Sequence, residues 1–167
     1  ILEWARLANE VIREANSFFS SLADSYQEII LALGIDAVTY TSLDEPYPKL
    51  FIIGQEWNES NEHPSLAFGI EWNKNNADFR KAYMGIWVNL ETPRGRDLSN
   101  KIGESVKQTF GTRRYGISSW WPAQRSIQPS RQDYWDYLAE LRQEIISSIQ
   151  ERWKDLNPII ERVLEGK

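Results

Sequence analysis

The sequence has no cysteine and only one histidine, His63. Without cysteine the chain can form neither a disulfide nor a thiolate nucleophile, as is typical of a cytoplasmic protein. Structural zinc sites use several Cys or His ligands, which this composition does not supply. We therefore predict that the chain has no metal site and no cofactor.

Long apolar runs are also lacking. No run approaches the ~18 residues that a membrane span requires, and the start of the chain shows no secretory signal pattern. We therefore expect a cytoplasmic protein without a membrane partner. The 167 residues suit one domain, residues 1–167, and because the chain opens at Ile1 rather than Met we expect this domain to belong to a longer protein.

Recognisable catalytic motifs are missing as well. Neither G-x-x-x-x-G-K-[ST] nor G-x-G-x-x-G occurs. Restriction-type nucleases place Asp or Glu two residues before Lys, and this spacing occurs only in Glu165-Gly166-Lys167 at the end of the chain. A surface position explains His63 better than a role as general base. The sequence assigns no catalytic residue and favours a non-enzymatic protein, with a metal-dependent nuclease-like domain as the weaker alternative.

Aromatic residues are abundant, with 8 Trp, 7 Tyr and 6 Phe. Such side chains serve in cores, at partner surfaces and as stacking platforms for bases. Four of them, Phe68, Trp72, Tyr83 and Trp87, belong to two runs between residues 65 and 91 in which apolar side chains fall on every second residue. This alternation predicts two antiparallel strands on either side of a polar break at Asn75-Asn76.

The rest of the chain is predicted to be mostly helical. We expect a long helix over residues 2–33, whose serines mark a candidate position for a break, then strands at 35–41 and 49–57. Asp97 is the expected N-cap of a helix over 98–110, and residues 112–129 are the least regular part. A capping box at Ser130 is expected to start a helix that ends before Pro158, followed by a short closing helix. The fold class is thus α+β: an antiparallel sheet of about four to five strands, with a long N-terminal helix and C-terminal helices packed mainly on one face.

Charge is distributed unevenly along the chain. The net charge is −5. Residues 94–131 nevertheless contain eight basic and two acidic side chains, a balance of +6 that leaves −11 for the remainder. A basic segment that also carries flat rings is typical of nucleic-acid surfaces, where cations meet phosphates and rings stack on bases. The predicted binding residues are Arg94, Arg96, Lys101, Lys107, Arg113, Arg114, Tyr115, Trp120, Trp121 and Arg125.

Two alternatives to this nucleic-acid surface remain open. Trp120 and Trp121 can instead fill the core beneath their loop, while the arginines pair with the acidic helices. A second candidate surface is the sheet face with Glu71, Tyr83 and Trp87, which is exposed if helices cover only the other face. An aromatic surface of either kind also suits a protein–protein interaction or homo-oligomer assembly domain.

The order of the elements resembles that of a known family. A leading helix, a sheet with a G-x-W-V-x-L strand (Gly85, Trp87, Val88, Leu90), a helix, an aromatic loop and a closing helix are similar to the McrB-like N-terminal domains. In place of that family's aromatic-Pro-Trp signature stands Pro48-Lys49-Leu50-Phe51. Accessory domains of restriction-type nucleases are equally similar. The resemblance implies DNA rather than RNA as the partner and a role in restriction-modification or another defence or DNA-processing system.

Overall fold

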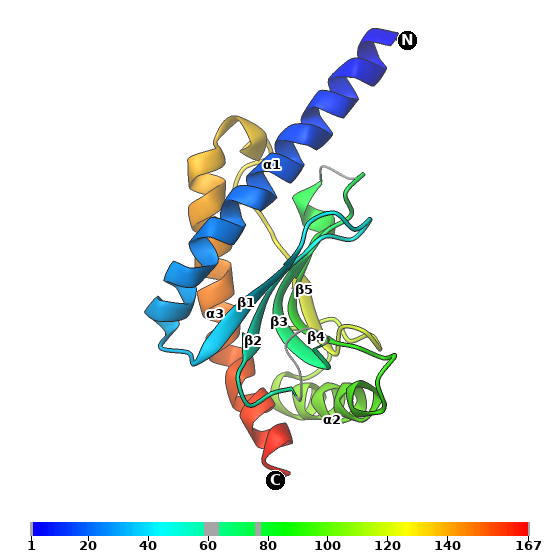
Figure 1. Ribbon diagram of the computed structural model, residues 1–167, viewed down its shortest axis with the longest axis vertical. Coiled ribbons are helices and arrows are strands. Elements are labelled where there is room, and N and C mark those ends of the chain that lie inside the picture. Colours follow the sequence, from blue (N-terminus) through cyan, green and yellow to red (C-terminus); the bar gives the residue numbers. More distant parts are fainter. Residues whose placement is uncertain (1, 59–63, 76–77, 167) are drawn as a thin grey trace.

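The computed structural model describes residues 2–58, 64–75 and 78–166. It contains three long helices, five strands and two short 3-10 helices (Figure 1). In chain order these are α1 (Leu2–Leu33), β1 (Ala37–Ser42), β2 (Lys49–Gly54), β3 (Leu66–Glu71), η1 (Phe79–Lys81), β4 (Tyr83–Val88), α2 (Pro93–Phe110), β5 (Ala123–Ser126), η2 (Tyr134–Asp136) and α3 (Leu138–Leu164).

The five strands form one antiparallel sheet in the order β1-β2-β3-β4-β5. Leu66 pairs with Val88 and Glu71 with Tyr83, so the two alternating runs are neighbouring strands. The α+β prediction with a long N-terminal helix is therefore confirmed. The fifth strand lies within the stretch expected to be irregular, where Ala123 pairs with Ile86.

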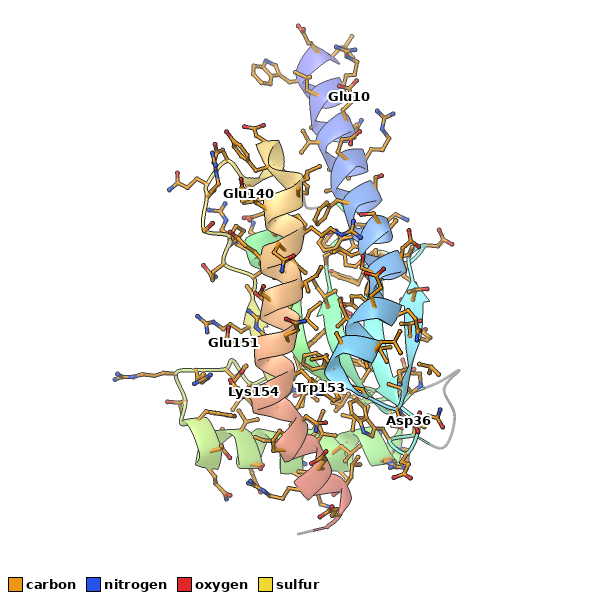
Figure 2. All side chains as sticks on the ribbon, turned by 90° about the vertical axis from the view of Figure 1, so that its left-hand side faces the viewer. Glu10, Asp36, Glu140, Glu151, Trp153 and Lys154 are labelled. Atoms are coloured by element: carbon orange, nitrogen blue, oxygen red, sulfur yellow. The ribbon has the colours of Figure 1, made fainter. Side chains whose placement is uncertain are left out.

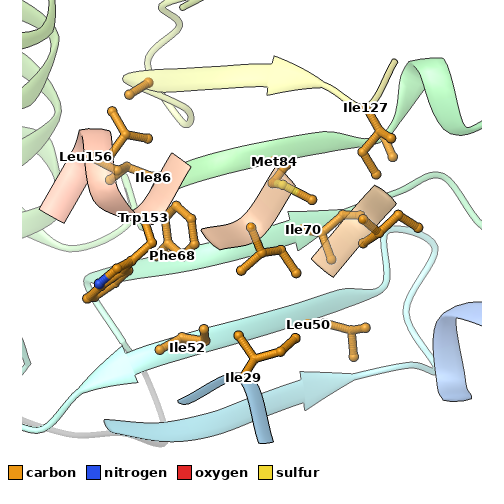
Figure 3. Packing of buried hydrophobic residues seen from close by; sticks show 14 of the residues in the cluster. Ile29, Leu50, Ile52, Phe68, Ile70, Met84, Ile86, Ile127, Trp153 and Leu156 are labelled. Atoms are coloured by element: carbon orange, nitrogen blue, oxygen red, sulfur yellow. The ribbon is translucent and has the colours of Figure 1, made fainter. Parts of the chain in front are cut away.

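One face of the sheet is covered by helices. Figure 1 shows α1 and α3 lying along this face, with α2 across one end of the sheet. Because side chains alternate along a strand, every second residue points to the helices, and these residues form the main core. Phe68 and Ile86 of the sheet face Trp153 and Leu156 of α3 in Figure 3, and Trp153 contacts Phe68 at 5.3 Å between ring centroids.

Two predicted helix starts are wrong. α2 begins at Pro93 rather than after Asp97, because Thr92 accepts a hydrogen bond from the Gly95 N–H at 2.9 Å and Pro93 suits the first helical position. α3 begins at Leu138, and no helix starts at Ser130.

The predicted helix breaks are also absent. α1 runs unbroken from Leu2 to Leu33. α3 continues through Pro158 to Leu164, although proline removes a backbone hydrogen bond. Leu156, Ile159 and Ile160 on either side of Pro158 are buried, and their packing outweighs that loss.

The N-terminal half of α1 extends away from the rest of the molecule, around Glu10 in Figure 2. Leu2, Trp4, Leu7 and Val11 are exposed there, whereas the apolar residues of α1 that follow, beginning at Ala15, are largely buried. Within the described residues, no helix combines the length and the apolar content that crossing a membrane requires.

Candidate binding cleft

The opposite face of the sheet carries a separate, smaller apolar cluster. Its buried members are Phe51, Ile53, Ala67, Trp87 and Trp121, with Val38 and Tyr40 packed beside them. Apart from Trp121, all of these belong to β1–β4, and Trp121 comes from the loop that precedes β5. A loop rather than a helix therefore covers part of this face.

Trp121 is a core residue of this second cluster and is only 4% exposed. Its ring lies 6.1 Å from that of Phe51 on β2 and 6.0 Å from that of Tyr83 on β4. Between these two rings the sheet pairs Gly69 with Gly85, neither of which has a side chain. The two glycines therefore leave room for the indole over the middle of the sheet.

Trp120, in contrast, is 41% exposed. Its carbonyl accepts a hydrogen bond from the Val88 N–H at 3.0 Å, and the carbonyl of Ser119 accepts one from the Ser99 hydroxyl at 2.6 Å. Its ring lies 6.0 Å from that of Trp87. These contacts with β4 and α2 hold the Trp120 ring at the edge of the open face, with one side available to a ligand.

Between the strands and this loop lies a cleft of about 610 Å³, a size typical of small-ligand sites. Its aromatic lining consists of Tyr40, Tyr47, Phe51, Trp87, Trp120 and Trp121. Its other lining residues are Glu45, Lys49, Pro64, Glu71, Asn89 and Glu91. Glu71 lies opposite Tyr83, and Trp87 follows Tyr83 by four residues on β4. The Glu71 end of the cleft is thus about 13 Å from the Trp120 end.

The charged groups of the cleft are three carboxylates and one ammonium. The Lys49 Nζ lies 2.7 Å from Glu45 and donates a hydrogen bond to the Tyr47 carbonyl at 2.9 Å. It lies 3.6 Å from Glu71, beyond hydrogen-bonding distance. Burial raises the pKa of Glu71, against the opposing effects of the Lys49 charge and the Trp121 side chain. Ionised Glu71 is therefore a destabilising group in the folded protein.

This pKa predicts that Glu71→Gln stabilises the protein at neutral pH. A carboxyl whose folded pKa is raised binds protons more readily in the folded state, so stability falls as pH rises from the unfolded to the folded pKa. Glutamine removes that loss, and we expect a gain within about 1 kcal/mol, or about 2–4 °C in Tm. Thermal unfolding at pH 7 and at pH 4 measures it. The gain should vanish at pH 4, and an equal gain at both pH values would contradict the assignment.

The predicted basic residues do not gather in one patch. Arg94 and Arg96 lie in the first turn of α2, next to Glu91 at the rim of the cleft, and Arg96 donates to the Leu90 carbonyl at 2.7 Å. Lys101 pairs with Asp97 at 2.7 Å. Among the described residues, no ion pair engages Arg94, Lys107, Arg113 or Arg125, whose charges are therefore available to an anion.

The far end of α2 has a different environment. Arg114 contacts Asp155 of α3 at 2.5 Å, and Tyr115 donates a hydrogen bond to the same carboxylate at 2.7 Å. Tyr115 is buried, which raises the pKa of its hydroxyl. α2 has 18 residues and is thus about 27 Å long. Arg114 and Tyr115 thus attach α3 to the loop that follows α2. This attachment lies at the opposite end of α2 from Arg94.

Several residues of the cleft were not among the predicted site residues, namely Tyr40, Glu45, Tyr47, Lys49 and Phe51. A signal for two of them was present in the sequence. In β2, Lys49, Phe51 and Ile53 alternate with Leu50 and Ile52, so the strand has a helix-facing side and an open side. Because residues 50–53 are all apolar, the alternation in this strand is masked in the sequence. The second candidate surface, with Glu71 and Trp87, does line the cleft.

Comparison with known proteins found no matching family model, curated protein or solved structure. The resemblance in element order therefore remains a prediction. Over the part of the chain that the structure describes, no three His, Asp or Glu side chains are arranged to hold a metal ion. His63 and Lys167 lie outside the described residues.

Proposed function

We propose that this protein is a non-catalytic nucleic-acid-binding module. The observation that carries the proposal is the half-exposed Trp120 at the rim of an aromatic cleft, with Arg94, which forms no ion pair with the described residues, in the adjacent first turn of α2. A base stacks on the exposed indole face, and the phosphates on either side meet the cations. DNA is the polymer that the element order implies, within a cytoplasmic defence or DNA-processing system.

The charge of the cleft supports placing the base inside the cleft and the phosphates outside it. Glu45, Glu71 and Glu91 repel phosphates, so the sugar–phosphate backbone stays outside the cleft. Nucleobases are uncharged at neutral pH, and base–aromatic stacking stabilises binding by about 1–3 kcal/mol per base. The aromatic lining therefore favours the base, while Arg94 and Lys107 along α2 favour the backbone.

We predict that Trp120→Ala weakens binding of a single-stranded DNA oligonucleotide about tenfold to a hundredfold, the value expected for one lost stacking contact. Fluorescence anisotropy with a labelled oligonucleotide measures the change. Trp4→Ala is the matched control, because Trp4 is 77% exposed on the extended half of α1, away from the cleft. Equal affinity of the Trp120 variant and the wild-type protein would contradict the proposal.

The contacts of the basic side chains with phosphates can be tested by measuring how binding affinity depends on salt concentration. Each phosphate contact contributes about 0.7 to the slope of log affinity against log salt for a single strand. We expect Arg94→Ala and Lys107→Ala each to reduce the slope by about this amount and to weaken binding to all sequences equally. Arg13→Ala on α1 is the matched control. An unchanged slope in both α2 variants would remove the backbone contacts from the proposal.

A second candidate function is a protein assembly domain, and a specific observation favours it. The exposed Leu2, Trp4, Leu7 and Val11 continue the apolar stripe of α1 beyond the part that is buried. Large exposed apolar patches mark interaction sites. Sedimentation at increasing protein concentration separates the functions. An assembly domain gains mass and loses this property in Trp4→Ala, whereas a nucleic-acid module stays monomeric and depends on Trp120.

A further inference from the structure

The cleft has a polar end that the stacking role of Trp120 does not use. Glu71 closes this end, its side chain only 14% exposed, at the last residue of β3. Glu71 pairs with Tyr83 of β4 on one side and with Lys49 of β2 on the other. Its carboxylate therefore faces the cleft between these two neighbouring strands. Because this end is about 13 Å from Trp87, beside which the Trp120 ring lies, it belongs to a different nucleotide of the same strand.

Glu71 retains capacity to accept hydrogen bonds. An ionised carboxylate has about four lone-pair sites. The Trp121 side chain engages this carboxylate, while Lys49 gives its short contacts to Glu45 and Tyr47 instead. Lys49, 3.6 Å away, and Trp121 therefore do not use all of the acceptor sites of this carboxylate, and an N–H group of a ligand in the cleft can occupy a further one.

Resting on the proposed function, we propose that this end of the cleft accepts an unpaired base edge-first, with an N–H group of its Watson–Crick edge donated to Glu71. In a duplex this edge is engaged by the complementary base and the ring faces are covered by neighbours. The ligand is therefore a single strand, or an unpaired stretch of one, rather than a fully paired duplex.

A methylated base tests this contact directly. N3-methylthymine keeps the flat ring of thymine but has no N–H on that edge. We expect an oligothymidylate of about ten nucleotides to bind roughly tenfold more tightly than the same oligomer with N3-methylthymine throughout, as for one lost charge-assisted hydrogen bond. In Glu71→Gln the difference should shrink to about two- to threefold, because a neutral acceptor forms the weaker bond.

Two further ligands, a blunt duplex and free thymidine, test whether the base must belong to a single strand. A blunt duplex should bind at least about tenfold more weakly than either of its strands, since its base edges are paired. Thymidine alone should bind far more weakly than the oligomer, because it lacks the phosphates that the α2 cations contact. Equal binding of the duplex, or of thymidine, would overturn the single-strand assignment.

The experiment separates this inference from the proposed function. If the methylated and unmodified oligomers bind equally while Trp120→Ala still weakens both, the edge contact to Glu71 is wrong and the nucleic-acid module stands. If no oligomer binds at any salt concentration, both proposals fail. Glu71→Gln is expected to fold, because glutamine has nearly the same shape and removes a destabilising buried charge.

Discussion

Gly85→Ala is expected to destabilise the protein by about 3–5 kcal/mol, a large share of the stability of an ordinary domain. A β-carbon at this position would lie 2.0 Å from the carbonyl oxygen of Ala123, on the neighbouring strand β5. The backbone at Gly85 also has φ +153°, which side-chain-bearing residues rarely adopt. Because the obstacle is backbone, β5 itself would have to move away from β4.

Urea unfolding followed by tryptophan fluorescence measures this loss. Gly103→Ala is the matched control. Gly103 lies within helix α2, and a β-carbon there would meet only the side chain of Ile117, at 3.3 Å. We expect the control to change stability by about 1 kcal/mol or less, since alanine also favours a helix. A Gly85 variant as stable as the control would show that β4 and β5 do not approach this closely.

Arg152→Met is expected to lower the free energy of unfolding by about 2–4 kcal/mol. Arg152 is 6% exposed on α3. It donates hydrogen bonds to the carbonyls of Arg125 at 2.6 Å and Ser126 at 3.0 Å, where β5 ends. Burial lowers the pKa of Arg152 to about 10, so the guanidinium stays protonated at neutral pH. Methionine fills similar space but leaves these buried carbonyls without a donor.

The matched control for Arg152 is Lys154→Met on the same helix. Lys154 is exposed, and Figure 2 labels it on α3 next to Trp153. We expect this control to change stability by less than about 0.5 kcal/mol. Thermal unfolding of both variants at neutral pH measures the difference, about 2–4 °C in Tm per kcal/mol for a chain of this size. Similar small losses in both would mean that α3 does not depend on Arg152 to secure β5.

Both positions also support the cleft. Gly85 allows β5 to approach β4 closely, and β5 follows directly on the loop that carries Trp120 and Trp121. The strand that these two positions stabilise therefore directly follows the loop at the candidate cleft.

The strands and helices themselves were largely predictable because their signals are local. Leu66, Phe68 and Ile70 alternate with residues of the other face, and this period of two predicts a strand without knowledge of its neighbours. Helix ends were less predictable, since competing caps lie close together. Thr92 and Asp97 are both good N-cap residues, and in the structure Thr92 is the cap, with its side chain accepting a hydrogen bond from the Gly95 N–H and Pro93 at the first helical position.

The candidate cleft was only partly predictable, because its residues come from segments far apart. Adjacent in sequence, Trp120 and Trp121 had equal claims as stacking residues, but Trp121 is buried over the glycines of the sheet and Trp120 is exposed. Arg114 lies in the basic segment, yet Asp155, 41 residues later, is its partner. Charge counts along the chain cannot show which cations are already paired.

The sequence by itself determined the α+β class, the two central strands and the two sides of each, because periodicity is a property of neighbouring residues. Only the tertiary structure decided that one side of the sheet stays free of helices, and that a loop from beyond α2 folds over it to form a cleft with Tyr40 and Glu71. The cleft is lined by residues from segments as far apart as Tyr40 and Trp121, and contacts between such distant segments are not encoded in any local sequence pattern.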